Sequence, residues 1–353
     1  MKKYIAVLAG DGIGPEVTQQ AVNVLRKIAQ QFNHEFIFKD ALVGAAAIDA
    51  TGNPLPDETL ELCKKSDAIL FGAIGDPRFD NPSVAVRPEQ GLLKLRKALE
   101  LYANVRPIMT FTSLAAQSPL KEEVVRDVDF VVIRELTAGI YFGQPRVKAA
   151  DGSHAIDTCT YTREEIERVA EFAFELAAKR RNKVTLVDKA NVLATSQLWR
   201  EVVTDFAKKY PEIILDFLYV DNAAMQIIRN PRQFDVMLTE NLFGDILTDE
   251  ASVITGSLGM LPSASIGTRQ GFGLYEPIHG SYPQAAGKDI ANPVGAILSA
   301  ALLLRYSFGL EKEASAIEDA VKKVIEAGHG TVDIAPHHPL STIELSRRII
   351  EQL

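Results

Sequence analysis

The sequence contains very few cysteines. Only Cys63 and Cys159 occur among its 353 residues, too few for the disulfide framework that stabilises small secreted proteins. Two cysteines could still form a single bond, but a reducing compartment is the natural expectation for such a chain. The scarcity of cysteine therefore excludes a disulfide-rich scaffold and favours the cytoplasm.

Long apolar runs and an excess of positive charge are also missing. No stretch approaches the roughly 20 apolar residues of a membrane-spanning helix. The apolar run after Lys3 is interrupted at Asp11, before the hydrophobic region of a signal peptide is complete. The formal net charge of -8 at pH 7 argues against broad nucleic-acid binding, because such binding needs a basic surface. We expect a soluble protein that acts on small molecules.

Short apolar runs alternate with stretches of helical periodicity. With 47% hydrophobic and 24% charged residues, the chain is long enough for one large or two medium domains. Helices are predicted over 91–103, 164–181 and 311–327, and a polar arm or hairpin over 144–161. Strands are predicted at 5–9, 68–71, 130–133, 184–187 and 235–238. This order favours an α/β fold with a mixed, largely parallel sheet and with sites at the carboxyl ends of its strands.

A glycine-rich turn follows the first predicted strand. Gly10, Gly12 and Gly14 resemble the start of a dinucleotide-binding fingerprint, but the position of its third conserved glycine is occupied by Pro15. The fingerprint fails, so an ordinary turn between a strand and a helix is the simpler interpretation.

Two carboxylates are spaced to share one face of a helix. Asp245 and Asp249 are four residues apart, and like charges at this spacing repel each other unless a cation lies between them. Magnesium or manganese would resolve the repulsion, since either ion takes carboxylate ligands and completes its shell with water and substrate oxygens. The alternative is a solvated helix face.

Three arginines stand near predicted element ends. Arg96 and Arg106 flank the helical segment 91–103, and Arg134 follows the strand 130–133. Guanidinium groups bind carboxylates with two hydrogen bonds, so converging arginines would hold a di- or tri-acid. Tyr141 and Lys189 are ambiguous taken singly, and it is their joint occurrence with the arginines that indicates a site.

Six ordered motifs, taken together, resemble the β-decarboxylating dehydrogenases of the isocitrate/isopropylmalate family. They span essentially the whole chain: GDGIGPE (10–16), GLLKLR (91–96), RELT (134–137) with GIYFG (139–143), VDKANV (187–192), ENLFGDILTD (240–249) and EPIHGS (276–281). The resemblance implies a two-domain fold that is not a Rossmann fold. It places 1–102 and 256–353 in a larger, cofactor-side domain, and 103–255 with the arm in a smaller substrate and dimerisation domain. It also implies a homodimer with shared active sites.

The resemblance assigns roles to the charged residues. Arg96, Arg106 and Arg134 would bind the substrate carboxylates, and Asp245, Asp249 and the partner's Asp221 would hold Mg²⁺ or Mn²⁺. The partner's Lys189 takes the family's base position, and Tyr141 fits the donor that returns a proton to carbon after decarboxylation. Asp221 would lie beside the substrate as well as the ion.

Substrate choice is expected to depend on two apolar residues. Leu92 matches the position that contacts the isopropyl group of 3-isopropylmalate in the family, and Val192 resembles a second apolar contact. A third carboxylate, as in isocitrate, would be costly to bury there. D-malate, tartrate, homoisocitrate and isocitrate remain alternative substrates, and a non-catalytic regulatory subunit is an alternative of another class.

Cofactor binding is expected around a loop near residue 280. The residues that the resemblance assigns to NAD are Glu89, Asn191, His279, Gly280, Ser281, Gln284 and Asn292. Gln284 departs from the pattern, because NAD-dependent relatives have an aspartate there for the adenosine ribose. A glutamine neither repels a 2'-phosphate nor binds it strongly, so NAD is expected but strict exclusion of NADP is not.

Overall fold

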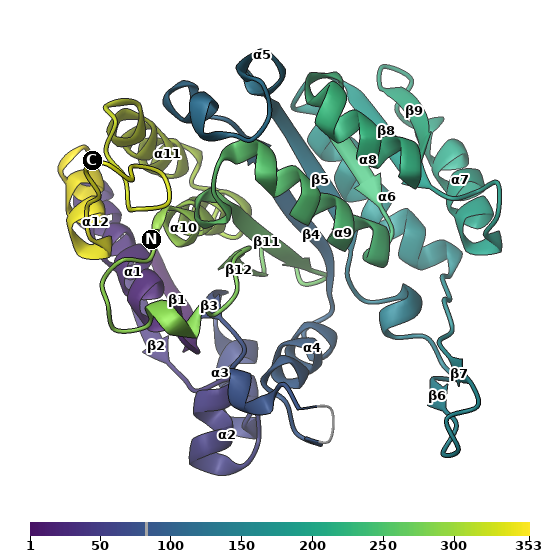
Figure 1. Ribbon diagram of the computed structural model, residues 1–353, viewed down its shortest axis with the longest axis horizontal. Coiled ribbons are helices and arrows are strands. Elements are labelled where there is room, and N and C mark those ends of the chain that lie inside the picture. Colours follow the sequence, from purple (N-terminus) through teal and green to yellow (C-terminus); the bar gives the residue numbers. More distant parts are fainter. Residues whose placement is uncertain (82–83) are drawn as a thin grey trace. The chain divides into compact units, whose positions relative to one another are not determined.

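The computed structural model describes residues 1–81 and 84–353, and the chain divides into two compact units (Figure 1). The first unit consists of Met1–Leu101, Phe111–Gln117 and Thr255–Leu353, and the second of Tyr102–Thr110 and Ser118–Ile254. Phe111–Gln117 belongs to the first unit because the Glu326 carboxylate accepts hydrogen bonds from the backbone N–H groups of Thr112 and Ser113. The domain limits implied by the family remain a prediction.

The sheet of the first unit is mainly parallel. Its strands lie in the order β2 (Glu35–Asp40), β1 (Lys2–Gly10), β3 (Ala68–Ala73), β12 (Gly273–Pro277) and β11 (Pro262–Gly267). Neighbouring strands are parallel except for the antiparallel pair β11 and β12. β3 is buried along its whole length, as expected for a parallel strand covered on both faces.

Helices cover this sheet. They are α1 (Gly14–Phe32), α2 (Ala45–Thr51), α3 (Asp57–Lys65), α4 (Pro88–Ala98), α10 (Val294–Tyr306), α11 (Glu311–Glu326) and α12 (Thr342–Glu351). α10 is apolar on all sides and almost fully buried, because it packs against β11, β12, α1 and α11. α3 and α4 cover the opposite face of the sheet. Cys63 of α3 and Leu95 of α4 pack there against Leu8 and Phe71 of the strands.

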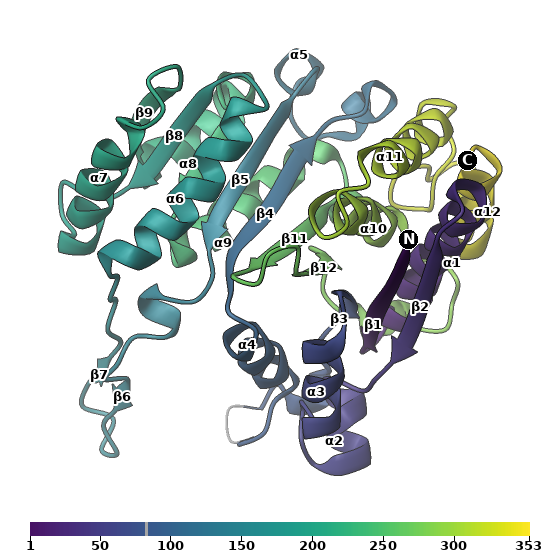
Figure 2. The same cartoon turned by 180° about the vertical axis from the view of Figure 1, so that it is seen from behind.

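The second unit is a sheet between two pairs of helices. Its strands lie in the order β4 (Leu101–Met109), β5 (Asp129–Glu135), β10 (Val236–Thr239), β8 (Lys183–Asp188) and β9 (Ile214–Tyr219). Only the pair β4 and β5 is antiparallel. Figure 1 shows α8 (Val220–Arg229) and α9 (Asn241–Ser252) on one face, and Figure 2 shows α6 (Arg163–Ala178) and α7 (Ala194–Ala207) on the other. The short helix α5 (Glu122–Val125) precedes β5.

Local sequence signals explain several element boundaries. Pro15 stands in the first turn of α1, and Asn33 ends that helix in the left-handed conformation. Thr162 begins α6 with a capping box, since its hydroxyl accepts from the Glu165 backbone N–H and the Glu165 carboxylate accepts from the Thr162 N–H. In the segment predicted as an arm, β6 (Val147–Lys148) pairs antiparallel with β7 (Ala155–Ile156) in an exposed hairpin.

The structure confirms the α/β fold class and each predicted strand, but the helix predicted over 91–103 is wrong at its end. α4 stops at Ala98, and Glu100 has a left-handed backbone with φ of 51°. Leu101 then begins β4, so Arg106 lies within that strand instead of flanking a helix. The apolar residues from Leu101 onward continue the helical spacing by chance but are buried in the sheet.

Among the helices in the described part of the chain, none combines the length and the apolar composition that crossing a membrane requires.

Candidate active site

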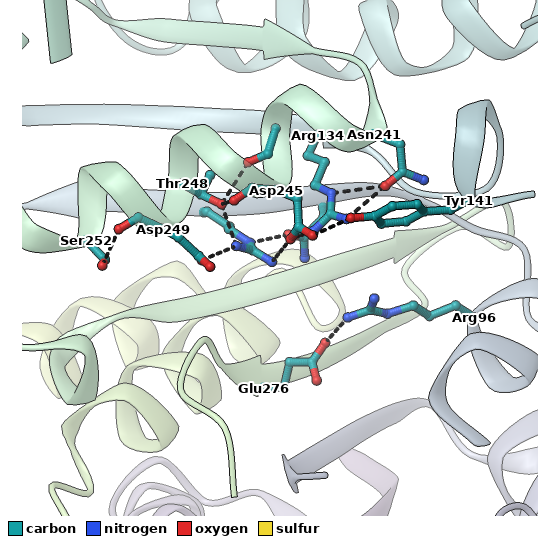
Figure 3. A network of polar contacts seen from close by, with 12 residues as sticks. Arg96, Arg134, Tyr141, Asn241, Asp245, Thr248, Asp249, Ser252 and Glu276 are labelled. Carbon is teal, nitrogen blue, oxygen red and sulfur yellow. Dashed lines mark hydrogen bonds and ion pairs between the residues drawn. The ribbon is translucent and has the colours of Figure 1, made fainter. Parts of the chain in front are cut away.

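A network of charged side chains occupies one end of the second unit (Figure 3). It joins Arg134 near the end of β5, Tyr141 in the short helix η3 (Gly139–Tyr141), and Asp245 on α9. Arg134 Nη1 lies 2.5 Å from Asp245 Oδ1, and the Tyr141 hydroxyl donates to Asp245 Oδ2 at 2.7 Å. The Arg134 guanidinium also lies over the Tyr141 ring, 5.7 Å from its centroid. One carboxylate therefore holds a predicted substrate-binding arginine beside the predicted proton donor.

Arg106 enters the same network from β4. Its Nε donates to Asn104 Oδ1 at 2.7 Å and its Nη1 to Thr248 Oγ1 at 2.5 Å. Two carboxylates lie somewhat further away, with 3.6 Å from Nη1 to Asp249 Oδ1 and 3.9 Å from Nη2 to Asp245 Oδ1. Arg106 is thus fixed by neutral partners and faces both carboxylates.

Asp245 and Asp249 share one face of α9, as their spacing predicts. The Asp249 side chain is 71% exposed and that of Asp245 36% exposed, so oxygen atoms of both are accessible. Desolvation raises the pKa of Asp249, Arg106 opposes the rise, and the neighbouring Asp245 carboxylate adds to it. Two accessible carboxylates that repel each other suit a hard divalent cation, which prefers oxygen ligands.

Among the described residues of one chain, Asp245 and Asp249 are not joined by a third protein ligand. Within 1–81 and 84–353, no three His, Cys, Asp or Glu residues are grouped closely enough to hold a metal ion. Asp221, at the start of α8, instead pairs with Lys189. The predicted three-aspartate site therefore remains a prediction that depends on a second subunit.

Lys189 and Asp221 form an ion pair beside β8. Lys189 Nζ lies 2.5 Å from Asp221 Oδ1, and the Lys189 backbone N–H donates to Ser196 Oγ at 3.0 Å. The hydrogen bond from Lys189 lowers the pKa of the exposed Asp221 carboxyl. The two residues that the family resemblance assigns to a partner chain are thus neighbours, so a partner chain would contribute both of them to the same active site.

The pKa of Tyr141 is raised, first by burial and then by the hydrogen bond to Asp245. A neutral phenol is preferred beside a carboxylate that it donates to, because ionisation would place two negative charges together. Tyr141 therefore keeps its proton at neutral pH, as a proton donor must.

The remaining predicted substrate contacts differ in burial. Arg96, on α4, donates from Nη2 to Glu276 Oε1 at 2.7 Å in a largely buried ion pair (Figure 3). Leu92 is half-buried against the core of the first unit, whereas Val192, in the loop after β8, is 66% exposed. Leu92 therefore packs on the core and keeps part of its surface open.

The predicted cofactor loop is tied to the glycine turn that follows β1. Ile13 N donates to the Ser281 carbonyl at 2.8 Å, and a Cβ on Gly12 would lie 2.0 Å from that oxygen. Asp11 fixes the turn from the other side, because its buried carboxylate accepts the backbone N–H groups of Ala45, Ala46 and Gly75. The turn therefore holds the loop in place without being a phosphate-binding fingerprint.

Polar groups of this loop suit a polar cofactor. Burial lowers the pKa of His279, whose Nδ1 lies 2.9 Å from the Gly280 carbonyl. Its Nε2 is buried and has no hydrogen-bond partner among the residues described, and a Cβ on Gly280 would meet open space. Asn292 is buried, and its Oδ1 accepts from the backbone N–H of Val294, the first residue of α10, at 3.0 Å.

The other predicted cofactor contacts lie at the surface. Gln284 is exposed in the short helix η7 (Pro283–Ala285), Glu89 is exposed on α4, and Asn191 is exposed in the loop after β8. No strain or buried contact distinguishes these three, so their roles remain predictions.

Sequence reasoning missed the neutral residues that orient the arginines. Asn241 Oδ1 accepts from Arg134 Nε at 3.1 Å and from Nη2 at 2.8 Å, and Thr248 and Asn104 serve Arg106 in the same way. Asn241 and Thr248 both lie within the motif of residues 240–249, but the charge pattern of that motif indicated roles only for Asp245 and Asp249. Glu276, the partner of Arg96, likewise begins the motif of residues 276–281.

The chain is similar to known proteins of one family over nearly its whole length. The family model described as isocitrate/isopropylmalate dehydrogenase matches residues 4–349. The chain is 56% identical to the 3-isopropylmalate dehydrogenase of Heyndrickxia coagulans, covering 100% of this chain and 97% of that protein. It is 53% identical to the Aquifex aeolicus enzyme of that name, covering 100% and 98%. Among solved structures, the isocitrate dehydrogenase of Methylococcus capsulatus superposes with a TM-score of 0.88 at 36% identity, covering 99% of each chain.

Proposed function

The chain belongs to the isocitrate/isopropylmalate dehydrogenase family, and we propose that it oxidises (2R,3S)-3-isopropylmalate and removes carbon dioxide from the product. The outcome would be 4-methyl-2-oxopentanoate, a precursor of leucine, with reduction of NAD. The observation that carries the proposal is the network in which Asp245 joins Arg134 and Tyr141, with Arg106 and Asp249 at its edge.

The arginines provide the sites for the two substrate carboxylates. Arg106 and Arg134 are buried in the second unit with their orientation fixed by neutral side chains, so each can present a planar edge to a carboxylate. Arg96, in the first unit, is the third arginine assigned to the substrate, and Leu92 on the same helix is the apolar contact for the isopropyl group.

The protein's own groups move the two protons. When bound, a divalent ion would supply positive charge beside the hydroxyl and carbonyl oxygens of the substrate, and NAD would accept the hydride. The partner's Lys189 occupies the position of the base and would take the hydroxyl proton as the hydride leaves the same carbon. Loss of carbon dioxide from the resulting 2-oxo acid leaves an enolate, and Tyr141 donates its proton to the carbon that lost the carboxylate.

Asp245, Asp249 and the partner's Asp221 are the oxygen ligands that would hold Mg²⁺ or Mn²⁺. Two observations support these residues as ligands of the ion. The carboxylate oxygens of Asp245 and Asp249 on α9 are accessible, and Asp221 pairs with Lys189, so a second subunit would contribute both residues to the same site. NAD would be bound by His279, Ser281 and Asn292 of the first unit, with Gln284 near the adenosine ribose.

This assignment of Lys189 and Asp221 requires a homodimer with shared active sites. The outer face of α8 and α9 exposes large apolar side chains, with Met225 at 54% and Ile246 at 59%. A hollow of about 360 Å³ beside Met225 is lined by Ala224, Ile228, Arg229 and Glu250. A second copy would bury this face, because apolar patches of this kind mark association surfaces. Both cysteines are free, which fits the proposed cytoplasmic location.

The decisive experiment follows NAD and NADP reduction by absorbance with magnesium or manganese. The acids are 3-isopropylmalate, D-malate, tartrate, homoisocitrate and isocitrate, each with a chelator control. We expect metal-dependent NAD reduction that is fastest with 3-isopropylmalate. A preference for another acid would overturn the role of Leu92, and silence with all five would favour a non-catalytic subunit.

A further inference from the structure

Asn241 uses every polar atom that it has. It is the first residue of α9 and is buried. Its backbone N–H donates to the Tyr161 hydroxyl at 2.9 Å, and Nδ2 donates to the Ala138 carbonyl at 3.1 Å. Its Oδ1 accepts from both Nε and Nη2 of Arg134. A buried amide with all its groups satisfied is held rigidly, because any rotation would leave polar atoms unpaired.

Tyr161 fixes the other side of this contact. Its buried ring packs edge-on against Trp199, with centroids 5.4 Å apart. Gly139, which begins η3, approaches so closely that a Cβ there would lie 2.2 Å from the Tyr161 hydroxyl oxygen, and its φ is +75°. Gly139 N also donates to the Thr160 carbonyl at 3.0 Å. Tyr161 thus contacts the first residue of η3, which carries Tyr141, and the first residue of α9, which carries the aspartates.

The consequence concerns the orientation of Arg134. A guanidinium is planar, so a single oxygen that accepts from Nε and Nη2 fixes the whole plane. With that edge held by Asn241, Nη1 lies 2.5 Å from Asp245 Oδ1. We propose that Asn241 is a positioning residue that sets the plane of Arg134, and that the Tyr161 hydroxyl in turn holds Asn241 in place. The edge of Arg134 that binds a carboxylate is thereby connected to Tyr161, which follows the β6–β7 hairpin in the chain.

The kinetic test rests on the proposed function and compares two replacements of Asn241. Asn241→Leu has similar size but no acceptor, whereas Asn241→Asp keeps an oxygen for Arg134 and loses the bond to the Ala138 carbonyl. We expect Asn241→Leu to raise KM for 3-isopropylmalate about tenfold, the scale of one hydrogen bond to a charged group. Asn241→Asp keeps the oxygen that accepts from Arg134 but adds a negative charge beside it, so it should hold the plane of Arg134 in a crystal structure although its KM for 3-isopropylmalate also rises. KM for NAD should stay unchanged in both.

Tyr161→Phe removes only the hydroxyl that Asn241 N–H donates to. We expect it to raise KM for 3-isopropylmalate by about threefold to tenfold. Tyr275→Phe is the matched control, because Tyr275 is also buried and its hydroxyl makes one hydrogen bond, to Ser307 Oγ at 2.7 Å. Trp199 is the sole tryptophan, so an unchanged emission maximum reports that the contact around Tyr161 remains folded.

A crystal structure of the Asn241→Leu protein tests the positioning without any assumption about substrate. We expect the Arg134 guanidinium to turn, so that Nη1 leaves hydrogen-bond distance of Asp245. The proposal is overturned if Arg134 keeps its place in Asn241→Leu, if Asn241→Leu keeps the wild-type KM, or if Arg134 turns in Asn241→Asp as well. If the wild-type protein reduces neither NAD nor NADP with any of the acids, only the proposed function is refuted, because the crystal structure still shows whether Asn241 positions Arg134.

Discussion

Replacing Glu240 by glutamine should change how stability depends on pH. Glu240 is the residue before α9 and is only 6% exposed. Burial raises its pKa from the ordinary 4.5 to about 7, and the nearby Glu135 carboxylate adds to the rise. Cys159 Sγ lies 3.9 Å from Oε2 as a weak donor. Burial also raises the pKa of Glu135 itself, so both buried carboxyls favour the protonated form.

The size and sign of the effect follow from that pKa. A rise from 4.5 to about 7 corresponds to about 3 kcal/mol at about 1.36 kcal/mol per pH unit. The folded protein holds this proton more tightly than the unfolded chain does, so the stabilisation is complete below about pH 4.5 and is lost as pH rises through 7. Because Glu135 shares the environment, the titration belongs to the pair. Glu240→Gln has no proton to lose in this range, so it should remove most of the pH-dependent loss of stability.

Urea unfolding at pH 5, 6, 7 and 8 measures the difference. Protein concentration must be fixed, because the stability of a dimer depends on it. We expect the free energy of unfolding of wild type to fall between pH 5 and 8 by on the order of 3 kcal/mol more than that of Glu240→Gln. Glu164→Gln, at an exposed position on α6, is the control and should follow wild type. Parallel curves for wild type and Glu240→Gln would refute the raised pKa.

Two further substitutions test the chemistry. Lys189→Ala should lower kcat by about 10²–10⁴-fold, the usual contribution of a general base. Lys208 is an exposed lysine at the end of α7, so Lys208→Ala is the control and should leave kcat unchanged. Undiminished turnover in Lys189→Ala would contradict the assigned base. Gln284→Asp should raise the ratio of kcat/KM for NAD to that for NADP by about tenfold, since a carboxylate repels a 2'-phosphate. An unchanged ratio would show that Gln284 lies away from the adenosine ribose.

Local patterns predicted the elements that local forces determine. The buried parallel strands are apolar runs because both their faces are covered, and Asp245 and Asp249 share a face because helical spacing alone places them there. The prediction over 91–103 was wrong where two elements adjoin. α4 ends and β4 begins within three residues of each other, and the apolar residues of both elements merge into one apparent helical pattern.

Contacts between distant parts of the chain were beyond sequence reasoning. Arg106 and Thr248 are 142 positions apart, and Arg134 and Asn241 are 107 apart. No periodicity connects such pairs, because their proximity arises from the order of strands in the sheet. The family resemblance supplied the residue types of the site, but it gave no role to Asn241 or Thr248, which are neutral and carry out no chemistry.

Neutral partners at hydrogen-bond distance distinguish Arg106 from Arg305. Arg305 is surrounded by the carboxylates of Glu311 and Glu318, which raise its pKa and neutralise it locally. Arg106, by contrast, is fixed by a carboxamide and a hydroxyl at hydrogen-bond distance, and its carboxylate neighbours lie at 3.6 and 3.9 Å. A neutral acceptor orients a guanidinium without cancelling its charge, so the orientation is set in advance while attraction for a carboxylate remains. The sequence presents both arginines as equal cations, and only the packing around each determines which one can bind an acid.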